Sequence, residues 1–229
     1  MSGMSETLQL ALLLIPCLIV AIVFHEVAHG WTALALGDPT AKEQRRLSFN
    51  PIRHVDPIGT LLVPGAMALF GGPIFGWAKP VPVNFNRLDN PRLGMMLVAA
   101  AGPAMNVLLA ALGAIALGLY AGSFDGLQGV NEFVLGGMLL FITINTFLAL
   151  FNLLPIPPFD GSHIVEGLLP RSVAHHYAKL RNLGMLLFIA LIAAAWAFPD
   201  VGIIENTVGP PVEWMRGQFL MLAAWVAGG

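Results

Sequence analysis

The chain has 229 residues, a formal net charge of −2, and a composition that is 57% hydrophobic and only 10% charged. Soluble domains carry nearer a quarter charged residues, so this composition excludes an ordinary soluble domain and indicates an integral membrane protein. The small net charge gives no basis for binding nucleic acid. The single cysteine, Cys17, excludes both an internal disulfide and a zinc site built from thiolates.

The first predicted element is an apolar helix over residues 8–36, which is long enough to span the membrane and ends before a Gly-Asp-Pro stop signal. It contains the sequence His25-Glu26-Val27-Ala28-His29. On a helix the two imidazoles lie one turn apart on one face and can share a metal ion, with the Glu26 carboxylate beside them as a proton acceptor. Three ionisable groups are costly inside a membrane, so the cluster indicates a functional site.

The remaining elements follow from hydropathy. Residues 58–75 are apolar but interrupted by proline and glycine, and their uninterrupted part is too short to span, so we expect a re-entrant or interfacial segment followed by a short edge strand at residues 81–85. Further membrane helices are predicted at residues 93–120, 133–154 and 183–198, within a membrane-embedded domain of residues 1–198. The C-terminal segment, residues 199–229, contains a weaker apolar stretch at 212–226 that we expect to form an additional or interfacial helix.

The basic residues predict the orientation of the chain. Ten of the eleven lysines and arginines lie in residues 37–92 and 155–182, and the loops at 121–132 and 199–211 carry none. The positive-inside rule therefore predicts a multi-pass protein of the cell membrane, with its N-terminus outside and both basic segments in the cytoplasm. The histidine pair lies towards the cytoplasmic end of the first helix, so we expect the active site near the cytoplasmic face.

A hydrolytic zinc site takes three protein ligands and leaves a fourth position for water, so a third ligand must join the two histidines. The third predicted span ends in Asn152-Leu-Leu-Pro155-Ile-Pro-Pro-Phe-Asp160-Gly161, where prolines break the helix and the Asp-Gly turn can direct a carboxylate inwards. We predict Asp160 as the third ligand. His163, Glu166 and His54 are alternatives on the same predicted side of the membrane.

At these two motifs the chain resembles the site-2 protease family of intramembrane zinc metalloproteases, peptidase family M50. Supporting similarity lies in residues 50–57, 76–84 and 101–106. The resemblance implies an all-α polytopic membrane protein with a catalytic core of the first three predicted helices. To that core we add one or two C-terminal membrane helices and the small cytoplasmic or re-entrant β segment. The chain looks like a short form without PDZ or CBS domains.

The resemblance also implies the chemistry: one zinc ion per chain, held by His25, His29 and Asp160, with Glu26 as the general base. The expected reaction is endopeptidase cleavage of transmembrane segments, and the expected partners are single-span membrane proteins within the lipid bilayer. No oligomeric state is predicted.

Other residues are candidates for binding the substrate or stabilising the oxyanion, and each has a simpler structural explanation. Asn152 can instead satisfy carbonyls at a helix end, and Asn106 can hydrogen-bond between helices. Asn84 can serve a turn, and His54 can be a loop residue whose hydrogen bonds are satisfied locally.

Two alternative functions remain at this stage. A metal transporter also places histidine and acidic residues on membrane helices, but would normally show a path of such residues through the midplane, whereas here the second and fourth predicted spans carry none. A protein that only binds membrane helices would not need the intact Glu26.

Overall fold

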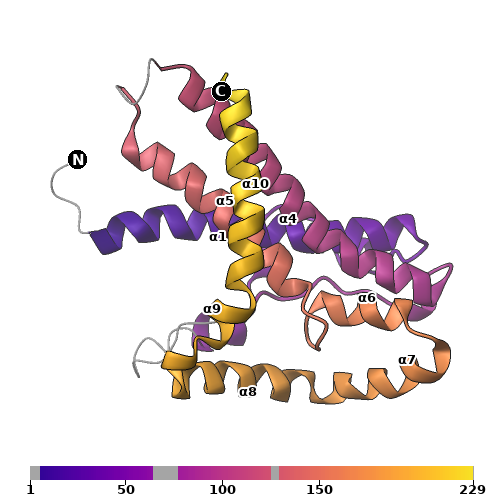
Figure 1. Ribbon diagram of the computed structural model, residues 1–229. Coiled ribbons are helices and arrows are strands. Elements are labelled where there is room, and N and C mark those ends of the chain that lie inside the picture. The colour runs from indigo at the N-terminus through magenta and orange to yellow at the C-terminus, as the bar shows by residue number, and fades with distance from the viewer. Residues whose placement is uncertain (1–5, 64–76, 125–128, 229) are drawn as a thin grey trace.

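The computed structural model describes residues 6–63, 77–124 and 129–228, and these residues are mainly helical (Figure 1). The long helices are α1 (Glu6–Ala35), α4 (Pro91–Gly122), α5 (Glu132–Asn152) and α10 (Gly209–Val226). Shorter helices link them: α2 (Thr40–Glu43), η1 (Pro51–His54), η2 (Pro57–Leu62), η3 (Phe85–Arg87), α6 (Asp160–Leu168), α7 (Arg171–Ala178), η4 (Lys179–Leu183), α8 (Gly184–Ala197), η5 (Pro199–Val201) and α9 (Ile203–Thr207).

Within the described parts of the chain, four helical stretches are long and apolar enough to cross a membrane: Leu8–Ala35, Pro91–Gly122, Glu132–Asn152 and Arg171–Ala197. Together with the composition, they describe a multi-pass membrane protein. Helices α1, α4, α5 and α8 coincide with the four predicted spans to within two residues at each end. Helix α10 covers the predicted C-terminal stretch and packs on α4 and α5. The domain limits stay a prediction, and residues 64–75 of the predicted re-entrant segment lie outside the described residues.

Local capping explains where the two central helices begin. Asn90 accepts a hydrogen bond from the Leu93 amide at 3.2 Å, and Pro91 occupies the first turn of α4, where its missing N–H costs nothing. Asn131 similarly accepts bonds from the amides of Phe133 and Val134 at the start of α5. These caps satisfy backbone donors that would otherwise be exposed at the membrane surface.

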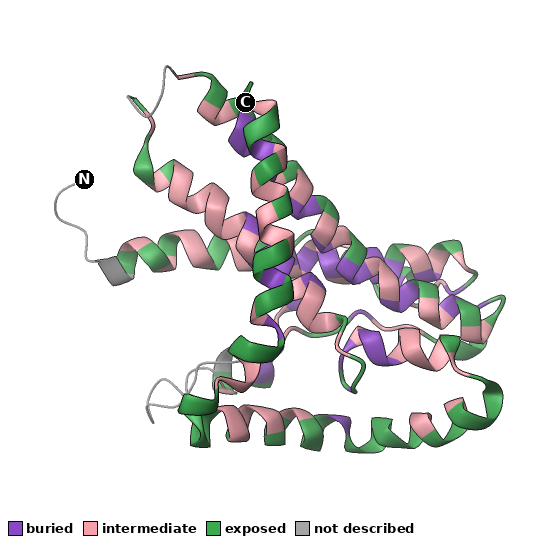
Figure 2. Cartoon of the chain, viewed as in Figure 1, coloured by how far each residue is buried: buried purple, intermediate pink, exposed green. Residues whose placement is uncertain are grey.

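The core lies where α1, α4, α5 and α10 cross, and Figure 2 shows the buried residues gathered there. Small side chains allow the helices to approach closely, since alanines from α4 and α10 meet one isoleucine of α5. The cluster consists of Ala110, Ala114, Leu117, Ile142 and Ala223. This cluster joins α4, α5 and α10, and α1 packs against α4 and α5 beside it.

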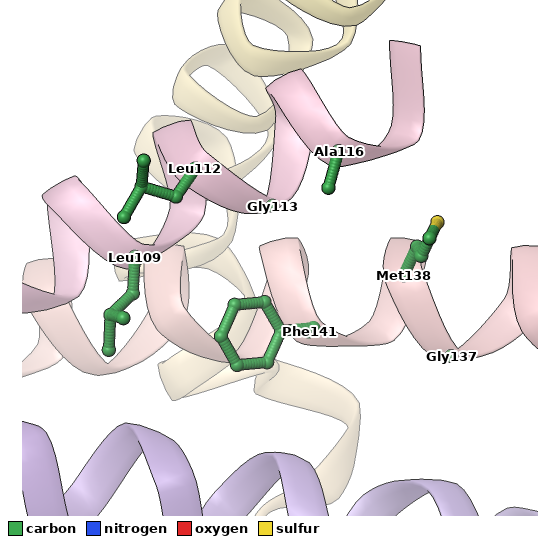
Figure 3. A pocket seen from close by; sticks show the side chains of 7 residues that line it. All are labelled: Leu109, Leu112, Gly113, Ala116, Gly137, Met138 and Phe141. Carbon is green, nitrogen blue, oxygen red and sulfur yellow. The ribbon is translucent and has the colours of Figure 1, made fainter. Parts of the chain in front are cut away.

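A small apolar pocket of about 360 Å³ lies between α4 and α5 (Figure 3). No charged or hydrogen-bonding side chain lines it. Its lining residues are Leu109, Leu112, Gly113, Ala116, Gly137, Met138 and Phe141. The pocket therefore offers no group for chemistry, and the functional site must lie elsewhere.

Residues 160–197, which we call the arm, comprise α6, α7, η4 and α8. In Figures 1 and 2, α8 runs along the lower edge of the molecule, apart from the crossing of α1, α4 and α5, and is largely exposed. Its apolar side chains include Leu186 and Trp196, each 63% exposed. Lipid would cover such a surface in a membrane. One of its ring contacts with the rest of the chain is Phe188 against Phe159, with the ring centroids 5.7 Å apart.

The expected β segment at residues 81–85 is wrong: within the described residues there is no strand, and residues 77–84 run as an irregular segment. Pro80 and Pro82 lack the N–H groups that a ladder needs. The amides that remain bond to loops and to a side chain instead of a neighbouring strand. Trp77 donates to the Gly59 carbonyl at 3.1 Å and Lys79 to the His54 carbonyl at 2.9 Å.

Candidate metal centre

Three side chains from two elements converge at the inner end of α1. His25 and His29, one turn apart on α1, bring their Nε2 atoms to 3.0 Å from each other. Asp160, the first residue of α6, places Oδ2 3.2 Å from Nε2 of His25 and 3.4 Å from Nε2 of His29. Both histidines are buried, with exposed fractions of 7% and 8%. The chain folds so that residues 131 or more positions apart share one small space.

The hydrogen bonds of the histidines determine where their protons lie. His25 Nδ1 contacts Oδ1 of Asn106 at 2.6 Å, and His29 Nδ1 contacts the backbone carbonyl of Val98 at 2.7 Å. Both partners are acceptors, so both Nδ1 atoms carry the proton and both Nε2 atoms present a lone pair in the neutral rings. Asp160 Oδ2 is also buried, with no hydrogen-bond partner. Three lone-pair atoms therefore face one another.

This arrangement fits a metal ion. Two imidazole nitrogens and one carboxylate oxygen are a ligand set that zinc takes in hydrolytic sites, and tetrahedral bonds of about 2.0–2.2 Å imply ligand atoms roughly 3.3–3.6 Å apart. The observed separations of 3.0, 3.2 and 3.4 Å lie close to that range. Lone pairs at such distances repel one another unless a cation or a proton lies between them.

Gly102 of α4 provides the room beside the two rings. A Cβ at this position would lie 2.6 Å from Nε2 of His25 and still closer to Nε2 of His29, nearer than real side-chain contacts come. The absent side chain leaves a space at the two Nε2 atoms. The helix packing of α4 on α1 is therefore shaped around the centre.

Packing at the start of α6 holds Asp160 in place. The neighbouring Phe159 is buried, and its ring lies 4.7 Å from Phe151 of α5 between centroids. Gly161 lies against the carbonyls of Leu153 and Leu154, so closely that a Cβ could not fit. These contacts fix the backbone at residue 160 and direct the carboxylate of Asp160 towards the two histidines.

Glu26 lies beside the three converging side chains. Its Oε2 atom accepts a hydrogen bond of 2.7 Å from the Val81 amide, which ties the carboxylate to the irregular segment at residues 77–84. A cavity of about 560 Å³ is lined by Glu26 together with the three converging side chains. Its polar lining consists of His25, Glu26, His29, Asn152, Asp160 and His163, and its apolar lining includes Trp77, Val81, Met185 and Phe188.

The structure separates the remaining candidates. Asn152 lines the cavity, and its Nδ2 also donates to the Leu148 carbonyl at 2.9 Å, as a helix-end amide would. Asn84 caps η3 through the Asn86 amide, and buried His54 bonds to the Ser48 carbonyl at 2.7 Å. Neither residue is among those lining the cavity.

Of the alternative third ligands, His163 lines the cavity, whereas Glu166 pairs with Arg181. Neither is among the three converging side chains.

Sequence reasoning missed three contributors to the site: Asn145, the Val81 amide and Gly102. Asn145 carried a usable signal, since it is an amide side chain in an otherwise apolar helix, where polar groups need partners. Val81 acts through its backbone amide and Gly102 through the absence of a side chain, and neither effect can be recognised from the residue type alone.

Comparisons with known proteins agree with the geometry. A model of peptidase family M50 matches residues 130–195. The Bacillus subtilis protein named "Putative zinc metalloprotease YwhC" is 41% identical over 179 residues, covering 78% of this chain and 78% of that protein. Two further relatives are named "Putative zinc metalloprotease Rip2". The one from Mycolicibacterium smegmatis is 30% identical over 76% of this chain and 64% of that protein. The one from Mycobacterium tuberculosis is 28% identical over 79% of this chain and 68% of that protein. No solved structure matches.

The membrane helices, the His-Glu-x-x-His helix and the distant carboxylate are those of a membrane metalloprotease. The chain belongs to peptidase family M50, the site-2 protease family.

Proposed function

We propose that this protein is an intramembrane zinc endopeptidase that hydrolyses peptide bonds in transmembrane segments of partner proteins. One zinc ion per chain is held by His25, His29 and Asp160. The observation that carries the proposal is the convergence of three lone-pair atoms, within 3.4 Å of one another, beside the Glu26 carboxylate in an apolar helix bundle. The names of the relatives, which describe zinc metalloproteases, support the choice of metal.

Glu26 acts as the general base. When bound, zinc acts as a Lewis acid that polarises the scissile carbonyl and makes water more acidic. The Val81 amide engages Oε2 of Glu26, so Oε1 is the atom that takes the proton from water and delivers it to the leaving amine. His25 and His29 keep their Nε2 lone pairs towards the centre because their Nδ1 protons are bound elsewhere.

The substrate must be extended when it is cut, because a helix hides its carbonyls in hydrogen bonds. The segment at residues 77–84 is suited to hold such a peptide. Between residues 77 and 81 the odd-numbered groups face the protein: the Trp77, Lys79 and Val81 amides are bonded, and Arg46 donates to the Lys79 carbonyl at 2.7 Å. Where backbone groups alternate in this way, the carbonyls of Ala78 and Pro80 face the other way and can accept bonds from substrate amides.

The orientation of the protein follows from its charges. The described residues around the opening of the centre, in 37–63, 77–92 and 155–182, carry ten of the eleven basic side chains, which supports a cytoplasmic location for this end. The N-terminus is then outside. The substrates are single-span membrane proteins that reach the cavity from the lipid bilayer.

Glu26→Gln tests the proposal. The variant keeps a side chain of the same size but cannot accept the proton, so purified protein should bind zinc like the wild type and fail to cleave a membrane-embedded reporter. Glu43→Gln, at an exposed carboxylate paired with Arg87, is the matched control and should cleave normally. Full cleavage of the reporter by Glu26→Gln would show that Glu26 is not the general base.

A second measurement separates the peptidase from a metal transporter. Zinc flux into vesicles that contain the wild-type protein should be absent while the reporter is cleaved. Flux without cleavage would favour the transporter. Among the described residues, the three converging side chains form the single cluster of this kind, so no series of metal sites crosses the bundle there.

A further inference from the structure

We infer that Asn106 of α4 and Asn145 of α5 form a hydrogen-bonded relay that holds the His25 ring in its metal-binding orientation, as positioning residues for the centre. This inference rests on the proposed ligand role of His25. Both asparagines have exposed fractions of 0% and lie among apolar side chains of the helix bundle. Buried amides in a membrane protein are costly unless each polar group finds a partner.

Every polar atom of the Asn106 side chain has a partner. Nδ2 donates to the Ala21 carbonyl of α1 at 3.1 Å and to Oδ1 of Asn145 at 2.9 Å. Oδ1 lies 2.6 Å from Nδ1 of His25. The residue thereby joins α1, α4 and α5 at one point, directly behind the first ligand.

The partners determine the direction of the relay. Both protons of Asn106 Nδ2 are used on oxygen acceptors, so its Oδ1 must be the atom that faces His25. Asn145 presents Oδ1 to Asn106 because its own Nδ2 donates to the Phe141 carbonyl at 2.9 Å. Each amide therefore prevents its neighbour from flipping. The end result is an acceptor at His25 Nδ1, which places the ring proton there and the lone pair at Nε2.

His29 shows why His25 needs this arrangement. Its Nδ1 atom is held at 2.7 Å by the backbone carbonyl of Val98, which cannot rotate or flip. The corresponding acceptor for His25 is a side-chain amide, which can present either oxygen or nitrogen. The orientation of the His25 ring therefore depends on the side chain of Asn106 and, behind it, on that of Asn145. The orientation of the His29 ring depends on a backbone carbonyl only.

A purely structural role, as polar contacts between helices, makes a different prediction. Thr146, next to Asn145, is equally buried, but its hydroxyl donates to the Ile142 carbonyl of its own helix at 2.7 Å and has no link to His25. If the asparagines only stabilise the bundle, removing Asn145 or the Thr146 hydroxyl should affect stability and leave zinc affinity alone.

The test measures zinc affinity by chelator competition on full-length protein in detergent, together with thermal unfolding of the metal-free protein. Asn106→Leu should weaken zinc binding by about 10–100-fold, the usual cost of losing a partner behind a metal ligand. Asn145→Leu should weaken it by about 10-fold, since Asn106 stays but can flip. Asn145→Asp, whose protonated carboxyl can accept from Asn106 and donate to Phe141, should restore the wild-type affinity. Thr146→Val should also bind as the wild type does.

The absorption spectrum of the cobalt-loaded protein gives a second readout, because it reports the ligand geometry. It should change in both leucine variants and not in Thr146→Val. Wild-type zinc affinity and an unchanged cobalt spectrum in Asn145→Leu, with a loss of stability like that of Thr146→Val, would overturn the relay. If Asn106→Leu does not fold, zinc affinity and the cobalt spectrum of the two Asn145 variants are sufficient to test the relay. If the wild type itself binds no zinc, the proposed function has failed, and not only the relay.

Discussion

The proposed histidine ligands and the proposed aspartate ligand come from parts of the molecule that are held in different ways. His25 and His29 lie in the crossing of α1, α4 and α5, where their Nδ1 atoms are bonded at 2.6 and 2.7 Å to buried acceptors. Asp160 opens the arm, where α8 is largely exposed and contacts the ring of Phe159 through Phe188. Two of the three proposed ligands are therefore fixed within the bundle, and the third is the first residue of the arm, whose α8 is largely exposed.

One arginine joins the arm to the bundle, and another braces the arm internally. Arg92, in the first turn of α4, donates to the carbonyl of Leu169, directly after α6. Within the arm, Arg181 of η4 pairs with Glu166 of α6. These contacts hold α6 from its C-terminal end, while aromatic packing holds its first residue. We therefore expect zinc affinity to respond most strongly to substitutions inside the bundle and least strongly to substitutions along the arm.

Gly102→Ala should have the largest effect, because it acts within the bundle on both histidines. The added Cβ would lie 2.6 Å from Nε2 of His25 and closer to Nε2 of His29, and neither ring can move without breaking its Nδ1 bond. We expect zinc affinity to fall by more than about 100-fold, beyond the loss of one outer partner. Chelator competition measures it.

Gly217→Ala on α10 is the control for Gly102→Ala, since a Cβ there meets nothing within 4 Å. This variant should bind zinc normally. Normal zinc binding by Gly102→Ala as well would show that the space beside the rings is not part of the centre.

Asp160→Asn should come next, because it removes one charged ligand and leaves the histidine pair in place. The amide keeps the shape of the side chain but not its negative charge, so we expect zinc affinity to fall by about 100-fold, with normal helicity by circular dichroism. The matched control is Glu166→Gln on the same helix, whose carboxylate pairs with Arg181. Unchanged affinity in Asp160→Asn would direct attention to His163, Glu166 or His54.

Much of the helical frame was predictable because hydropathy and length decide which segments can cross a membrane. The pair His25 and His29 was predictable too, since helix periodicity alone puts both rings on one face. The structure brings Asp160 to that pair, as the proline-broken end of the third helix had suggested. The zinc ion itself and the role of Glu26 remain predictions.

The rest depended on groups that sequence patterns do not reveal. The segment at residues 77–84 alternates like an edge strand, but its amides bond to the Gly59 and His54 carbonyls and to Glu26, so no ladder forms. Asn106 and Asn145 were visible as polar residues in apolar helices, but their meeting depends on how α4 and α5 cross. Such contacts between distant residues require the three-dimensional structure.

Val81→Pro tests whether the hydrogen bond from the 77–84 segment to Glu26 of α1 contributes to catalysis. The substitution removes the one N–H that holds Oε2 of Glu26 and extends a run of prolines, in which an extended backbone is already favoured. A base that is present but no longer held should lower kcat by about 10-fold, less than the roughly 10²–10⁴-fold that general-base catalysis contributes as a whole, with zinc affinity unchanged. Steady-state cleavage of the reporter measures kcat and KM separately.

Val83→Pro is the comparison for Val81→Pro, because it alters the same segment without touching the bond to Glu26. It should preserve kcat. Equal losses in the two variants would mean that the segment matters for its shape and not for the Val81 amide.

Phe188→Ala should have the smallest effect, because Phe188 is not a proposed ligand and acts on Asp160 through the neighbouring Phe159. The variant removes an edge-to-face contact with Phe159, next to Asp160, and such pairs contribute about 0.5–1.5 kcal/mol beyond the area that they bury. If part of this loss reaches Asp160, zinc affinity should fall by about threefold, since each 1.4 kcal/mol corresponds to a factor of ten. Leu186→Ala, at a side chain that is 63% exposed on the same helix, should leave zinc affinity unchanged. A loss in Phe188→Ala as large as that in Asp160→Asn would mean that the arm is as firmly coupled to the metal centre as the bundle is, and the contrast between the two halves of the ligand set would no longer hold.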